Sequence, residues 1–201
     1  MKKIMFNDKY GLTDAVLQGR KTMTRRTVQE KYLRIYEDMS RLGQPCYPLE
    51  EWLIRKAAAY KVGEVVAVAQ SYKDLGCMKE WVEQHISPNP NAKPTDPFEK
   101  KYPGWNNKMF VPAELNKAHQ IRITDIKVER LQDISDEDCL KEGVRKNQNS
   151  CNLMYHGKYN DGLYHYPTAK AAFAALIDNV SGNGTWESNP LVFVYTFELI
   201  K

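Results

Sequence analysis

Two runs of consecutive apolar residues constrain the fold of this chain most strongly. Residues 65–68 read Val-Val-Ala-Val, and residues 191–195 read Leu-Val-Phe-Val-Tyr. Short apolar runs bounded by turn-forming residues, here Gly63 and Pro190, are typical of strands that are buried on both faces. We therefore predict strands at residues 65–72 and 191–200, and both begin inside a hydrophobic core.

Shorter strands and single helices alternate along the rest of the chain. Further strands are predicted at residues 4–6 and 121–131, and helices are predicted near residues 12–18, 135–143 and 168–181. Ser135 and Thr168 are of the residue types that cap helix N-termini, and Gly143 is typical of a C-terminal stop. This alternation, closed by a strand at the end, predicts an α+β fold built on a small mixed β-barrel with flanking helices.

The length of 201 residues and the hydrophobic share of 42% fit one domain with insertions. Three segments interrupt the pattern of strands and helices, near residues 28–60, 73–116 and 144–167. The segment near residues 28–60 contains apolar residues at helical spacing. The segments near residues 73–116 and 144–167 are predicted as long loops, and the former includes one short helix near residues 78–85. We expect a single domain spanning residues 1–201 with three long insertions.

The charge of the chain is unevenly distributed. The formal net charge is +4, but residues 1–62 carry 13 Lys/Arg against 7 Asp/Glu, or +6. A basic excess in one region favours an anionic partner such as nucleic acid. The four cysteines lack a CxxC pairing and a histidine at zinc spacing, so neither a metal site nor a cofactor is predicted. A signal peptide and a membrane-spanning run are not evident, and a cytoplasmic protein with no membrane partner is expected.

The basic excess centres on residues 18–26, which read Gln-Gly-Arg-Lys-Thr-Met-Thr-Arg-Arg. Lys21 and Thr24 could meet at the rim of one pocket, where a desolvated lysine loses its proton and acts as a base. The alternative is a solvated basic edge after a helix, because runs of charge usually face water.

Several segments together resemble the ASCH domain family, in its larger phage-associated form. Residues 19–26 match the pattern G-x-K-x-x-T-x-R, and residues 126–143 are similar to the family's second block. Trp186, Asn189-Pro190 and the strand after them resemble its closing block. Many larger members have V-R-E at the end of the middle strand, where this chain has Val68-Ala69-Gln70.

The resemblance implies a PUA-like β-barrel with a cleft, in a superfamily associated with RNA binding. A small bacterial member is an amidohydrolase that removes the acyl group from 4-acetylcytidine. Its catalytic lysine, threonine and glutamate correspond to Lys21, Thr24 and Glu142. The implied mechanism has Lys21 take the proton of Thr24, Thr24 attack the acyl carbonyl, and Glu142 pass a proton to the departing amine.

Five further residues are candidates for contacts with RNA or a modified nucleoside. Arg25 and Arg26 are suited to phosphate, with one of the pair expected to make the contact. Gln70, Tyr72 and Trp186 are suited to a base by hydrogen bonding and stacking, although Trp186 could equally cover the last helix as part of the core. The alternative function is a non-catalytic adaptor, which either binds RNA or contacts a protein partner through the long loops at residues 73–116 and 144–167.

Overall fold

The computed structural model describes residues 1–44, 47–79, 82, 105–109, 111–116, 119–146, 153–155 and 164–200. These residues form two compact units, each built from segments that are distant in sequence. The first unit combines Met1–Phe6 with the described parts of Val65–Ile121 and the end of the chain. The second combines Asn7–Glu64 with the described parts of Arg122–Leu199.

The larger sheet has the strand order β1-β3-β4-β8-β2, and it contains both parallel and antiparallel pairs. Its strands are β1 (Lys3–Ile4), β2 (Met23–Thr27), β3 (Val65–Val68), β4 (Gln120–Arg130) and β8 (Leu191–Ile200). The sheet and its helices confirm the predicted α+β class. The predicted barrel is not confirmed, because the sheet of the described strands is open, with β1 and β2 at its edges.

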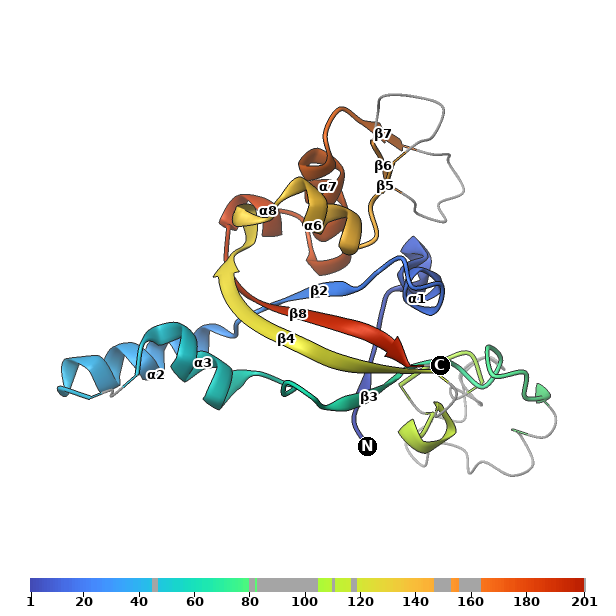
Figure 1. Ribbon diagram of the computed structural model, residues 1–201, viewed down its shortest axis with the longest axis horizontal. Helices are drawn as coiled ribbons and strands as arrows, with labels where there is room; N and C mark the ends of the chain where they lie inside the picture. Colours follow the sequence, from blue (N-terminus) through green and yellow to red (C-terminus); the bar gives the residue numbers. More distant parts are fainter. Residues whose placement is uncertain are drawn as a thin grey trace, which may run out of the picture. The chain divides into compact units, whose positions relative to one another are not determined.

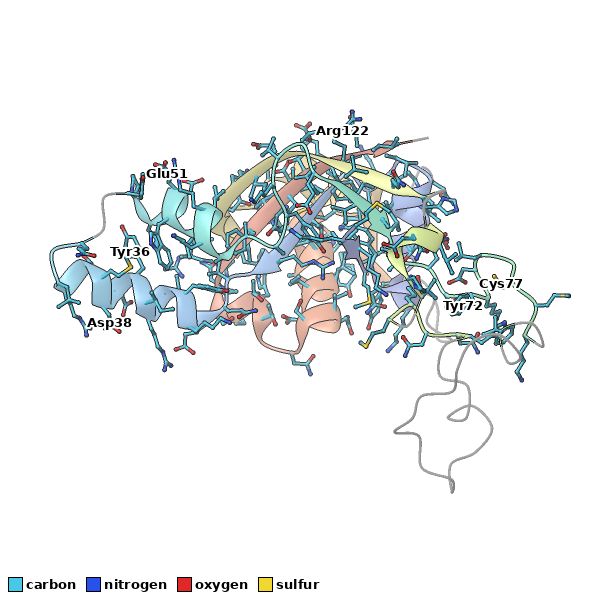
Figure 2. The ribbon with its side chains drawn as sticks, turned by 90° about the horizontal axis from the view of Figure 1, so that it is seen from below. Tyr36, Asp38, Glu51, Tyr72, Cys77 and Arg122 are labelled. Atoms are coloured by element: carbon cyan, nitrogen blue, oxygen red, sulfur yellow. The ribbon has the colours of Figure 1, made fainter. Side chains whose placement is uncertain are left out.

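In the first unit, β1 lies parallel to β3, with Ile4 opposite Val68. Ile4 and Val66–Val68 are almost completely buried, as the continuous apolar run predicts. A second apolar cluster contains Tyr72, Val82 and Val111. Figure 2 labels Tyr72 and Cys77, which both belong to this unit. A short 3₁₀ turn, Ala113–Asn116, contacts β3.

In the second unit, β2 pairs antiparallel with β8, and Arg25 lies opposite Val194. The central residues of β8, from Val192 to Tyr195, are buried on both faces, which confirms the prediction from their sequence. The helices α6 (Asp136–Lys141), α7 (Ala169–Ser181) and α8 (Thr185–Ser188) lie together in Figure 1, where α6 contacts β2. Ser135 and Thr168 cap α6 and α7 as predicted, each accepting a backbone N–H bond on its side-chain oxygen.

The insertion near residues 28–60 forms a helical hairpin of α2 (Glu30–Arg41) and α3 (Leu49–Ala57). Tyr36 points toward α3 and packs edge-on against Trp52, with ring centroids 5.5 Å apart, while Asp38 points away (Figure 2). No residue of α2 is fully buried, so this helix covers α3 rather than a core of its own.

The segment at residues 144–167 differs from its prediction as a loop. It contains a small antiparallel sheet of β5 (Arg145–Lys146), β6 (Leu153–Tyr155) and β7 (Tyr164–Tyr166). Strands of two or three residues are too short to show an alternating pattern in sequence, and they form only through pairing with one another.

Other predictions fall partly outside the described residues. Most of the predicted helix near residues 78–85 does so, as do Cys46 and Cys151. The helix α1 (Leu12–Leu17) and the 3₁₀ turns Asp8–Tyr10 and Leu131–Asp133 complete the described elements. In the described part of the chain, every helix is too short or too polar to cross a membrane.

Candidate functional site

Lys21 and Glu142 form a direct buried contact, although 121 positions separate them in sequence. Lys21 Nζ donates one hydrogen bond to Glu142 Oε2 at 2.6 Å and another to the Glu142 backbone carbonyl at 2.7 Å. Lys21 is only 2% exposed and Glu142 is 4% exposed. The structure therefore brings together two of the three residues predicted to be catalytic.

Two backbone features place this pair. The chain turns after α1, where Gly19 adopts a left-handed conformation with φ of 69° and the N–H of Lys21 bonds to the carbonyl of Ala15. The N–H of Thr22 then bonds to the carbonyl of Lys141 at 3.0 Å, which joins this turn to the end of α6.

Gly143 allows the stem of Lys21 to pass close to the backbone. Its φ of 110° suits glycine, and a Cβ at this position would lie 3.1 Å from Leu12 Cδ2 and 3.7 Å from Lys21 Cδ. The Lys21 side chain thus runs through a packed channel before it reaches Glu142.

Arg25 binds the same carboxylate from β2. Its Nη1 donates to Glu142 Oε1 at 3.1 Å, so both carboxylate oxygens of Glu142 accept a bond from a cation. The Nε and Nη2 groups of Arg25 donate to Glu129 Oε1 at 3.0 and 2.6 Å, and Nη2 also lies 3.4 Å from Asp138 Oδ2. We call Lys21, Arg25, Glu129, Asp138 and Glu142 the buried charge cluster.

The buried charge cluster changes the ionisation of both cations. Burial lowers the pKa of Lys21, and the attraction of Glu142 opposes that shift only in part. For Arg25, burial acts to lower the pKa, but the attraction of Glu142 and Glu129 outweighs it and raises the pKa. Arg25 therefore stays charged, whereas Lys21 is the group of the cluster that can give up its proton.

The side chain of Thr24 does not lie with those of Lys21 and Glu142, the other two predicted catalytic residues. It is 4% exposed and pairs with Tyr195 in the regular register between β2 and β8. Successive side chains of a strand point to opposite faces, so Thr24 faces away from Arg25 and Glu142. On the Thr24 face, the Tyr195 hydroxyl accepts a bond from the Ala59 N–H at 2.9 Å, and its ring lies 5.3 Å from that of Tyr60.

The two arginines predicted as phosphate contacts have different environments. The Arg25 side chain has no exposed surface and is directed at carboxylates and at the ring of Phe173, 5.9 Å away. Arg26 is exposed, and its charge acts on Lys21, Tyr60 and Tyr195. Of this pair, only Arg26 is exposed, whereas the charge of Arg25 is used within the fold.

Gln70 and Tyr72 belong to the first unit and are 6% and 3% exposed. The Gln70 N–H donates to Asn116 Oδ1 at 3.1 Å. Tyr72 packs with Val82 and Val111 in the apolar cluster, so most of its ring surface is used by the core.

Trp186 is half-buried and packs on α7. Its ring lies edge-on to Phe173, with centroids 6.2 Å apart, and its backbone N–H donates to Asp178 Oδ1 at 2.8 Å. Its carbonyl accepts a bond from Gln132 Nε2 at 2.8 Å. These contacts are those expected of a residue that covers the last long helix.

The backbone conformation and the side-chain bond of Asn189 account for an asparagine at this position after Trp186. It has a left-handed backbone with φ of 43°, and its Oδ1 accepts the Gln132 N–H at 2.9 Å. Replacing Asn189 with alanine keeps the strained backbone and loses the bond, and we expect a loss of about 1–2 kcal/mol in the free energy of unfolding. Asn189→Gly loses only the bond and should cost less. Urea unfolding of the two variants tests this order, and equal losses would contradict it.

Glu129 and Asp138 are members of the cluster that sequence reasoning missed. Each lies in a segment rich in charge, where a single carboxylate gives no sign of burial. The available signal was the strand alternation of residues 23–27, because a buried arginine on β2 requires carboxylates on the neighbouring elements. Among the described residues, no group of His, Cys, Asp and Glu is arranged to hold a metal ion.

Comparisons of this chain with protein-family models, curated proteins and solved structures gave no match.

Proposed function

We propose that this chain is an ASCH-type protein that binds RNA or a modified nucleoside and hydrolyses an acylated cytidine amide. In this proposal its open sheet is part of a PUA-like barrel, and Lys21 and Glu142 are the acid–base pair. The observation that carries the proposal is the buried contact between Lys21 Nζ and Glu142 Oε2. A lysine whose pKa is lowered by burial can take up and release a proton near neutral pH.

The reaction needs one proton to move twice. A nucleophile gives its O–H proton to Lys21 Nζ as its oxygen bonds to the acyl carbon. When the bond from that carbon to the exocyclic nitrogen of cytidine breaks, the proton passes to the departing amine. If the nucleophile is water, the acid is released at once. If it is a side-chain hydroxyl, the acyl group remains on it as an ester, and a water molecule hydrolyses this ester in a second round of the same proton transfers. Glu142 stabilises the ammonium form of Lys21 between these steps, which its 2.6 Å contact supports.

The nucleophile in this proposal is either the Thr24 hydroxyl or a water molecule. The resemblance favours Thr24, whereas the register of β2 directs Thr24 away from Glu142. Thr24→Val keeps the shape of the side chain and removes its hydroxyl. Loss of turnover in this variant, with a normal unfolding transition, identifies Thr24, and full turnover identifies water.

Binding is assigned to the exposed Arg26 and to the basic excess of residues 1–62. Contacts to phosphate weaken as salt rises, because binding releases counterions. Titration of a short RNA at two salt concentrations, with wild type and Arg26→Ala, measures this contribution. Arg122→Ala is a matched control, because Arg122 is an exposed arginine outside residues 1–62 that pairs with Glu198.

The test of the whole proposal is incubation of the pure protein with 4-acetylcytidine, followed by measurement of released cytidine. We expect release by wild type and by Arg122→Ala. No release by wild type, whether the acetylated cytidine is supplied free or within a short RNA, would overturn the catalytic part.

A second candidate function is binding without catalysis, as an adaptor. It is favoured by the saturation of Glu142, whose two carboxylate oxygens already accept bonds from Lys21 and Arg25. In that case the buried charge cluster is a structural device, and RNA or a protein binds elsewhere on the chain. RNA binding without turnover, unchanged in Lys21→Met, supports this candidate.

A further inference from the structure

One polar atom stands out in the first unit because it is buried without a partner. Gln70 lies two residues after the end of β3 and is 6% exposed, and its Oε1 accepts no hydrogen bond. Among the described residues it is the only buried side-chain nitrogen or oxygen in this condition. The catalytic proposal makes no use of this atom.

The backbone of Gln70 is firmly held. Its N–H donates to Asn116 Oδ1 at 3.1 Å, and Asn116 is completely buried. Asn116 Nδ2 donates in turn to the carbonyl of Pro112 at 3.2 Å, which fixes the orientation of the amide. The N–H of Ala69, one residue earlier, bonds to the carbonyl of Ile4 at 2.9 Å. Gln70 is therefore fixed at its backbone, while its side-chain oxygen is left without a bond.

Such an arrangement opposes stability. An amide oxygen that loses its bond to water on burial and gains none in the protein costs free energy. A methionine of similar length would fill the same space without that cost. Unsatisfied buried groups in native proteins require an explanation. One explanation is that the group bonds to a hydrogen-bond donor of a ligand, because functional sites trade stability for activity.

We propose that Gln70 Oε1 is a recognition group that accepts a hydrogen bond from a neutral N–H of a ligand bound by the first unit, such as the exocyclic amine of an amino-bearing nucleobase. The identity of the ligand as a nucleobase rests on the proposed function. An uncharged carbonyl suits an uncharged donor, since a buried cation would require a carboxylate. Asn116 holds the backbone of Gln70, so only the side chain has to adjust when the ligand arrives.

Two nucleosides and two variants test this inference. Cytidine presents an amine where uridine presents a carbonyl, so wild type should bind cytidine at least about tenfold more tightly. Gln70→Met should abolish this preference. Gln70→Glu keeps an oxygen acceptor at the same place and should retain it. Binding is measured by calorimetry with wild type and both variants. An unchanged preference in Gln70→Met would overturn the proposal.

Thermal unfolding supplies a readout that needs no ligand. If Gln70 Oε1 is unsatisfied, Gln70→Met should leave the Tm unchanged or raise it. Gln132 is the matched control, because its amide is used within the fold through the bond from Nε2 to the carbonyl of Trp186. Gln132→Met should therefore lower the Tm by about 2–4 °C.

The outcomes separate this inference from the proposed function. If neither nucleoside binds wild type, nucleobase binding fails, and the Tm of Gln70→Met still tests the unsatisfied oxygen. If Gln70→Met lowers the Tm as much as Gln132→Met does, Gln70 Oε1 is bonded within the fold, for example to a water molecule, and the inference is wrong. If cytidine binds without preference over uridine, nucleobase binding stands and the role of Gln70 fails.

Discussion

Replacing Glu142 with alanine is expected to lower the free energy of unfolding by roughly 3–5 kcal/mol, the range for breaking a buried ion pair from one side. The variant removes the carboxylate that binds Lys21 Nζ at 2.6 Å and Arg25 Nη1 at 3.1 Å. Arg25 keeps its bonds to Glu129, whereas the buried Lys21 loses the carboxylate that neutralises its charge. Urea unfolding measures the loss.

Glu51 provides the control for this experiment. Its carboxylate lies 2.7 Å from Arg55 Nη2, but both side chains are about half exposed. Exposed ion pairs on a helix contribute only about a few tenths of a kcal/mol, so Glu51→Ala should hardly change the free energy of unfolding. A loss in Glu142→Ala no larger than in Glu51→Ala would show that the buried charge cluster does not hold the fold together.

A double-mutant cycle assigns the effect to the pair. Lys21→Met and Glu142→Gln each leave one charged partner behind, while the double variant leaves neither of the two charges. The double variant should therefore be less destabilised than the sum of the two single variants. Strict additivity would mean that Lys21 and Glu142 act on stability independently.

Local signals in the sequence predicted most of the elements in this fold. The apolar runs at residues 65–68 and 191–195 are buried strands, and Ser135 and Thr168 cap helices. These features depend on neighbours within a few positions, so sequence patterns capture them. The short strands of residues 144–167 do not depend on close neighbours in this way. Each of them forms only by pairing with another strand, so the sequence pattern did not predict them.

The buried charge cluster also shows that local sequence patterns do not reveal contacts between distant residues. Arg25 and Arg26 are identical side chains at adjacent positions, yet one is buried among carboxylates and the other is exposed. Only the pairing of β2 with β8 decides which face each occupies. The contact of Lys21 with Glu142 spans 121 positions, and it was anticipated only through the resemblance, since no local pattern joins the two residues.

Replacing Lys21 with methionine is expected to reduce the turnover of 4-acetylcytidine by about 10²–10⁴-fold, the usual contribution of a general acid or base. Methionine keeps the length of the apolar stem in the channel beside Gly143, where Lys21 Cδ lies 3.7 Å from the Cβ position. The loss should therefore appear in kcat while the unfolding transition remains cooperative. Turnover that survives this substitution would show that the mechanism is wrong.

The same variant tests the ionisation of Lys21 without any substrate. Because burial lowers the pKa of Lys21 below the 10.5 of the unfolded chain, the unfolded state binds more protons between the two values. The part of the stability that is linked to this pKa shift is thus fully present above pH 10.5 and lost as the pH falls through the lowered pKa. Urea unfolding across pH 7–10.5 should give a difference between wild type and Lys21→Met that grows with pH. A difference that shrinks with pH would mean that the contact with Glu142 raises the pKa instead, and a lysine held so firmly as a cation would be a poor base.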